Sequence, residues 1–113
     1  MILKTIIEKY VMNNPLLAGI APAHPGALLR EDILPAIAKS KAEIARLLGV
    51  SRRTLYDILS ERRPVTAAMA LRLGKLLGNR PEMWLNMQHA YDLRAAARDL
   101  AGQLAEIPTL KAA

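Results

Sequence analysis

A segment of twenty residues, from Ser40 to Leu59, limits the possible folds more than any other part of this chain. Ser40 and Ser51 each precede a short amphipathic stretch, and a serine hydroxyl that accepts a backbone N–H is a common start of a helix. Gly49 lies between the two stretches, where a residue that tolerates positive φ can end the first helix. Ala45 is small, so two helices can cross closely there. The spacing therefore predicts two short helices joined by a tight turn.

The two helices are expected at about residues 41–48 and 52–59. Ser40 and Glu43 have the spacing of a capping box, in which the serine accepts from the third amide and the glutamate reaches back to the cap. The buried face of the first helix is expected to contain Ile44, Ala45, Leu47 and Leu48. The second helix is expected to pack on the first through Leu55, Ile58 and Leu59. This pattern is typical of a helix-turn-helix, whose second helix lies in the major groove of DNA.

Upstream of this pair, the sequence predicts an amphipathic extension and one further helix. Apolar residues recur at helical spacing over residues 2–12, and residues 15–25 form a linker with three prolines. A helix is expected over residues 26–33, and Pro35 bends or ends it. Met12 is an alternative start of the protein, and translation from it would remove the first helix.

Downstream of the pair, the sequence predicts two more helices. Thr66 is expected to cap a helix over residues 67–77. A long helix then begins near Pro81, with Asn79 as the nearest conventional cap, and continues to about residue 104. There is no strand pattern in this part of the sequence, so we expect an all-α fold.

Basic residues are concentrated in the helix-turn-helix segment. From Lys39 to Arg63 there are seven basic and three acidic residues, so this segment carries +4 of the chain's formal net charge of +6. A small basic domain is typical of proteins that bind a polyanion, either nucleic acid or an anionic membrane surface. An arginine cluster is commonly no more than a solvated charged face. Its coincidence here with the polar face of a helix-turn-helix favours DNA.

We expect the polar face of the second helix to contact bases and its surroundings to hold phosphates. Arginine can pair with guanine through two hydrogen bonds, and a helix N-terminus with hydroxyl side chains can bind phosphate. Asp57 could accept from a cytosine amino group or orient Arg53, which lies one turn earlier. The residues expected at base edges are Arg52, Arg53, Tyr56 and Asp57. The residues expected at phosphates are Lys41, Ser51, Thr54, Arg62 and Arg63.

The sequence contains no pattern typical of an enzyme, a metal site or a cofactor site. There is no cysteine, and neither His24 nor His89 has a partner at metal-ligand spacing, so both are interpreted as structural or surface residues. No glycine-rich phosphate loop and no acid–base pair is visible. No apolar run approaches ~18 residues, so no membrane span and no export are expected. The absence of cysteine fits a reducing cytoplasm.

Three stretches of the sequence carry a resemblance to a known family: HPGALLREDILPAI, AEIARLLGVSRRTLYDILSERRPVTAAMALRLGKLLG and PEMWLNMQHAYDL. From His24 to about Leu93, the chain resembles the HigA/VapI group of addiction-module antitoxins, in the phage-repressor-like helix-turn-helix class. It departs from the family pattern after the second helix of the pair, where Ser60-Glu61 replaces Asn-Gly. Glu61 must therefore avoid positive φ or adopt it at some cost.

The resemblance implies a five-helix repressor-like helix-turn-helix fold. We expect its DNA-binding domain at residues 24–79 and its long C-terminal helix, for dimerisation, at 80–113, with an N-terminal amphipathic helix and linker at 1–23 beyond the usual start of the family. The resemblance also implies an antitoxin of a type II toxin-antitoxin module. Such an antitoxin binds palindromic operator DNA as a homodimer, represses its own promoter and neutralises a RelE-like mRNA endonuclease of the HigB type. The alternative is a stand-alone repressor without a toxin, and a weaker one is an RNA-binding or purely protein-binding helical domain.

The surfaces for a second subunit and for the toxin are less well defined by the sequence. Trp84 lies in the first turns of the long helix and is expected in the core. Three leucines further along the helix have less of the domain to pack on and are expected at the dimer interface: Leu93, Leu100 and Leu104. The amphipathic residues 2–12 either pack on their own domain or dock on the toxin or the other subunit.

Overall fold

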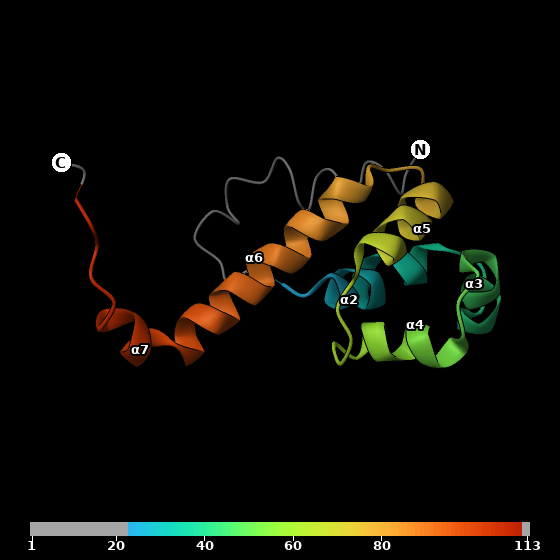
Figure 1. Cartoon of the computed structure of the whole chain (residues 1–113). Coiled ribbons are helices and arrows are strands. Elements are labelled where there is room, and N and C mark those ends of the chain that lie inside the picture. The colour runs from blue at the N-terminus through green and yellow to red at the C-terminus, as the bar shows by residue number, and fades with distance from the viewer. Residues whose placement is uncertain (1–22, 112–113) are drawn as a thin grey trace.

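The computed structural model describes residues 23–111, and all regular structure within that range is helical (Figure 1). The expected helix over residues 2–12 and most of the expected linker lie outside the described residues. The helices are α2 (Pro25–Leu28), a π-helical turn (Leu29–Ile33), a 3-10 turn (Leu34–Ala36), α3 (Lys41–Leu48), α4 (Arg52–Leu59), α5 (Ala67–Leu77), α6 (Pro81–Asp99) and α7 (Ala101–Ala105).

The first helical run is longer than predicted and changes its winding. Leu34 donates its N–H to the carbonyl of Leu29, five residues earlier, so the turn is wider than in an α-helix. Pro35 then falls within the closing 3-10 turn, where its missing N–H ends the helical ladder. Ile37 is extended, with φ −101° and ψ 124°. The prediction that Pro35 bends or ends this helix is confirmed.

The ends of α3, α4 and α5 lie where the sequence predicted them. Ser40, Ser51 and Thr66 each accept the backbone N–H of the residue three positions later. Gly49 and Gly78 end α3 and α5 with φ of 73° and 75°. These hydrogen bonds close within one turn, so they need no distant part of the chain.

Two details of α3 differ from the prediction. The carboxylate of Glu43 does not reach back to the cap but bonds to Arg46, whose Nε donates to Oε2 at 2.8 Å. A charged guanidinium one turn away is a stronger partner than a single backbone amide. Leu47 was expected in the core, but 42% of its surface is exposed. Because α3 is only eight residues long, Ile44, Ala45 and Leu48 are enough to cover its contact with the other helices.

A single core joins the helix-turn-helix to the beginning of α6. Trp84 is fully buried, as predicted, and lies among aliphatic side chains of the other helices. Asn79 was expected to cap α6, but its Oδ1 accepts from Trp84 Nε1 at 3.2 Å, and no side chain caps the helix. A buried indole N–H needs a partner, so Asn79 satisfies Trp84 instead of the helix amides.

The long helix predicted to continue to residue 104 is interrupted. Helix α6 ends at Asp99, Leu100 has φ −102° and ψ 8°, and the short α7 follows. In Figure 1, the second half of α6 and α7 extend away from the packed helices. The described part of the chain is therefore elongated, with extents of 56 × 31 × 24 Å. No helix among the described residues is both long and apolar enough to cross a bilayer.

Candidate nucleic-acid interface

Helix α4 is held against the domain by direct backbone packing. Leu55 and Ile58 are each 1% exposed and Leu59 is 4% exposed, so the predicted apolar face is buried. Gly26 of α2 lies against Ile58: a Cβ at position 26 would be only 1.9 Å from the Ile58 carbonyl oxygen. His24 starts α2, because its Nδ1 accepts from Gly26 N at 2.9 Å. The His-Pro-Gly stretch thus fits α2 closely onto α4.

Two arginines that were not predicted as functional residues hold the C-terminal ends of α3 and α4. Arg72 of α5 donates to the carbonyls of Leu48 and Gly49, at 2.8 and 3.4 Å. Arg30 donates to the Leu59 carbonyl at 2.6 Å. Helix C-termini need donors for their last carbonyls, but partners 24 and 29 residues away in the sequence leave no local signal.

The polar face of α4 is exposed, as predicted. Arg52, Arg53 and Tyr56 are all exposed, and 88% of the Arg53 side chain is open to solvent. Lys41 at the start of α3 lies near the same face, with Nζ 5.7 Å from the centre of the Tyr56 ring. That distance allows a cation–π contact, which links the start of α3 to the middle of α4. The structure therefore brings Lys41 next to the residues expected at base edges.

Ser51 caps the N-terminus of α4, and its hydroxyl group also bonds to that of Thr54. Ser51 Oγ accepts from Thr54 N at 3.0 Å and donates to Thr54 Oγ1 at 2.9 Å. Ser51 is exposed and Thr54 is partly buried, so both lie at the edge of the basic face. Their main role in the free protein is to start the helix.

The loop after α4 carries the second arginine pair. Arg62 Nε donates to Ser60 Oγ at 3.0 Å, and Arg63 Nη2 lies 3.5 Å from Asp57 Oδ2. Glu61 has φ 65°, so it adopts the left-handed conformation that glycine would adopt at lower cost. The carboxylate of Glu61 is 3.2 Å from Arg30 Nη1, which ties this strained residue to the first helical run.

Each of the three acidic residues in the basic segment lies beside an arginine. Glu43 pairs with Arg46, and the hydrogen bonds from that guanidinium hold the pKa of Glu43 below its usual value. The other two pairings are Asp57 with Arg53 and Arg63, and Glu61 with Arg30. None of these carboxylates therefore presents an uncompensated negative charge beside the exposed face of α4.

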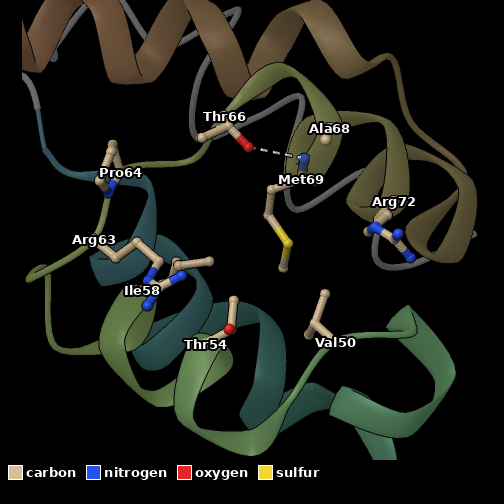
Figure 2. A pocket seen from close by; sticks show the side chains of 9 residues that line it. All are labelled: Val50, Thr54, Ile58, Arg63, Pro64, Thr66, Ala68, Met69 and Arg72. Carbon is tan, nitrogen blue, oxygen red and sulfur yellow. Dashed lines mark hydrogen bonds between the residues drawn. The ribbon is translucent and has the colours of Figure 1, made fainter.

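A shallow hollow of about 150 Å³ lies between α4 and the start of α5 (Figure 2). Figure 2 shows Thr54 and Ile58 on its α4 side, Met69 on the α5 side, and Arg63 and Arg72 near its two ends. No acidic residue lines it. Across the described residues, no group of three or more His, Asp or Glu side chains is placed to hold a metal ion.

Comparison with known proteins places this geometry in a family. A domain model described as "Helix-turn-helix" matches residues 37–85. Virulence-associated protein I of Dichelobacter nodosus is 43% identical over 76 residues, which are 67% of this chain and 70% of that protein. The antitoxin HigA of Pseudomonas aeruginosa, solved with the higBA promoter, is 38% identical with a TM-score of 0.75, over 80% of this chain and 99% of the other. The chain belongs to the HigA/VapI family of helix-turn-helix antitoxins. Antitoxin GraA, solved in complex with its operator, is 41% identical with a TM-score of 0.76, over 89% and 99% of the two chains.

Membership of the HigA/VapI family confirms the predicted fold class and the predicted resemblance. The family consists of DNA-binding antitoxins and regulators, so the expectation that the chain is not an enzyme is also confirmed. Residue-level roles on the α4 face remain predictions. So does the division of the chain at residues 23 and 79.

The three leucines expected at the dimer interface lie on the part of this HigA-family chain that extends beyond the core. Leu93 is 72% exposed, Leu100 41% and Leu104 47%. His89 of the same helix is exposed, whereas His24 is 3% exposed and structural. Burial lowers the pKa of His24 below 6.5, which keeps its Nδ1 unprotonated and able to accept from Gly26.

Proposed function

We propose that this chain is the antitoxin of a type II toxin-antitoxin module in the cytoplasm. It binds palindromic operator DNA as a homodimer, represses its own promoter and neutralises a RelE-like mRNA endonuclease of the HigB type. One observation carries the DNA part of the proposal. Helix α4 has an exposed cationic face, its opposite face is packed on α2 and the core, and relatives of this chain were solved with an operator or promoter.

The DNA-contacting residues follow from the orientation of α4. Its aliphatic side faces the core, so Arg52, Arg53 and Tyr56 face outward, and a helix of this size fits the major groove. Lys41 and the start of α4, with Ser51 and Thr54, would lie beside one phosphate strand. The loop arginines Arg62 and Arg63 would lie beside the flanking backbone.

The DNA proposal is tested by removing the two arginines at the start of α4. The DNA to be used is an operator duplex selected from a random pool by the wild-type protein. For this duplex, the double variant Arg52→Ala, Arg53→Ala should lose roughly tenfold or more in affinity for each base contact that is lost. Its salt dependence should also become shallower, because fewer counterions are released. The control is Lys75→Ala with Arg80→Ala, which removes the same charge from exposed positions at the end of α5 and before α6. Equal losses in the two variants would mean that only net charge matters, and the proposed face would be wrong.

Dimerisation is proposed through the extended part of α6 and through α7. Leu93 and Leu100 are 72% and 41% exposed, so this helix has apolar surface that the described part of the chain does not cover. Two copies joined there would present two α4 helices about one DNA turn, ~34–36 Å, apart, which fits a palindromic site.

Sedimentation tests the dimer. Leu93→Asp with Leu100→Asp should convert the dimer to a 12.4 kDa monomer and weaken operator binding. Leu71→Asp is the matched control, because Leu71 is 63% exposed on α5 within the packed domain. A dimer that survives the first variant, or is lost equally in the control, would place the interface elsewhere.

The toxin part is supported by family membership alone. The test is whether the adjacent reading frame encodes a small basic RelE-like protein, and whether co-expression of this chain rescues cells from that protein. Rescue of growth would support an antitoxin. Absence of such a neighbour, with operator binding intact, would favour the alternative of a stand-alone helix-turn-helix repressor.

A further inference from the structure

Asp57 connects α4 to the loop that follows it, through both its backbone and its side chain. Its carbonyl accepts from Arg62 N at 2.9 Å, from Arg63 N at 3.2 Å and from Ser60 Oγ at 3.2 Å. These bonds fold the loop back onto the helix, so the loop arginines start from a defined backbone position. The Asp57 carbonyl thus helps to fix the backbone of both loop arginines relative to α4.

The carboxylate of Asp57 lies between two arginines that come from different elements. Its Oδ2 is 3.9 Å from Arg53 Nε, one turn earlier in α4, and 3.5 Å from Arg63 Nη2 in the loop. The Asp57 side chain is only 22% exposed, whereas those of Arg53 and Arg63 are 88% and 48% exposed. The carboxylate thus lies at the flank of the exposed face, and the guanidinium groups lie further out.

This position is poorly suited to direct contact with DNA. A carboxylate at the surface of a duplex is repelled by the phosphates, so its presence lowers binding to any sequence. A long arginine side chain loses rotational freedom when it is fixed on a base. A charged partner that restricts the rotamers of both arginines before binding reduces the entropy they lose on binding. The reduction applies only to the side-chain arrangement that the partner favours, and therefore only to the DNA sequences that fit this arrangement.

We propose that Asp57 is a positioning residue for sequence recognition: its carboxylate holds Arg53 and Arg63 in a fixed relation, instead of contacting a base itself. The inference rests on the proposed operator binding and adds a specificity determinant to it. Arg53 extends from α4 and Arg63 from the loop beyond it, so Asp57 sets how the helix contact and the flanking contact are spaced along the duplex.

The test compares Asp57→Asn with the wild type on two probes, a duplex selected from a random pool by the wild-type protein and a scrambled duplex of the same length. Asparagine keeps the shape and the backbone bonds but removes the charge. Affinity for the scrambled duplex should rise or stay equal, and affinity for the selected duplex should fall. The ratio between them should drop about tenfold, as for one lost base contact. Glu82→Gln is the control, because it removes an exposed carboxylate beside Arg80, at the start of α6.

The same substitution in an Arg53→Ala, Arg63→Ala background separates positioning from direct contact. Measurements at low salt keep binding detectable. If Asp57 acts through the arginines, Asp57→Asn leaves the ratio between the affinities for the two duplexes unchanged in that background. If Asp57 accepts from a cytosine amino group, Asp57→Asn still lowers this ratio in that background, and the proposal is overturned.

Two other results would count against the proposal. An unchanged ratio in Asp57→Asn, or an equal change in Glu82→Gln, would leave operator binding intact but remove the positioning role. A wild-type protein that binds the selected and the scrambled duplex equally would overturn both this inference and the proposed function.

Discussion

The close approach of α2 to α4 gives the sharpest prediction about stability. Gly26 of α2 packs against the last turn of α4, and an added Cβ would lie 1.9 Å from the carbonyl oxygen of Ile58 and 2.9 Å from its carbonyl carbon. An ordinary C···O contact is about 3.3–3.6 Å. Gly26→Ala therefore requires α2 to move away from α4 by roughly 1.5 Å.

The loss of stability in Gly26→Ala depends on which atoms have to move. Both partners are backbone atoms, so no side-chain rotation can relieve the overlap, and the shift would loosen the contacts of Leu28 and Leu29 in the core. Overpacking of a core costs ~1–3 kcal/mol, and a backbone clash belongs at the upper end. Alanine's better helix propensity offsets at most about 1 kcal/mol of this. We expect a net loss of about 2 kcal/mol or more, or roughly 8 °C in melting temperature for a domain of this size.

Thermal and urea unfolding followed by circular dichroism would measure the loss. Gly102→Ala in α7 is the control: nothing lies within 4 Å of an added Cβ there, so its unfolding midpoint should stay the same or rise slightly. If Gly26→Ala unfolds at the same midpoint as the wild type, then α2 does not pack closely on α4, and the His-Pro-Gly stretch does not have the role inferred for it.

Three further predictions concern stability. Because the pKa of His24 is lowered by burial, the unfolded chain takes up its proton more readily; stability should be constant above about pH 6.5 and fall as the pH drops below it, and urea titrations of His24→Asn, which keeps a capping acceptor, should show less of this fall. Glu61→Gly should raise the free energy of unfolding by up to about 1 kcal/mol, because left-handed strain exceeds the value of the exposed pair with Arg30; a lower urea midpoint would mean that the ion pair dominates. Ser51→Ala should lower it by about 1 kcal/mol through loss of the α4 cap, and an unchanged midpoint would show that packing alone starts this helix.

The boundaries of α3, α4 and α5 could be predicted because their signals are local. Ser40, Ser51 and Thr66 bond to an amide three residues away, and Gly49 adopts positive φ without help from other elements. The spacing of apolar residues likewise placed Leu55 and Ile58 inside and the arginines outside, since helical periodicity decides which residues share a face. The outward orientation of the candidate DNA residues is therefore a property of the sequence.

The contacts that hold these helices in place were decided by the tertiary structure. Arg30 and Arg72 reach carbonyls 29 and 24 residues away, and the close contact of Gly26 with Ile58 spans 32 positions. No local pattern encodes such pairs, because they depend on how the helices cross.

In the C-terminal part, too, some features follow from the sequence and others only from the tertiary structure. The apolar pattern around Leu93 and Leu100 predicted one long helix, but beyond Asp99 the described chain offers nothing to pack on, and Gly102 lowers helix propensity there. Sequence periodicity determines which face of a helix can be buried. Whether that face is buried, how far the helix continues and which distant side chains hold it are set by the neighbours that the fold supplies, because burial and long-range hydrogen bonds exist only once the chain has packed.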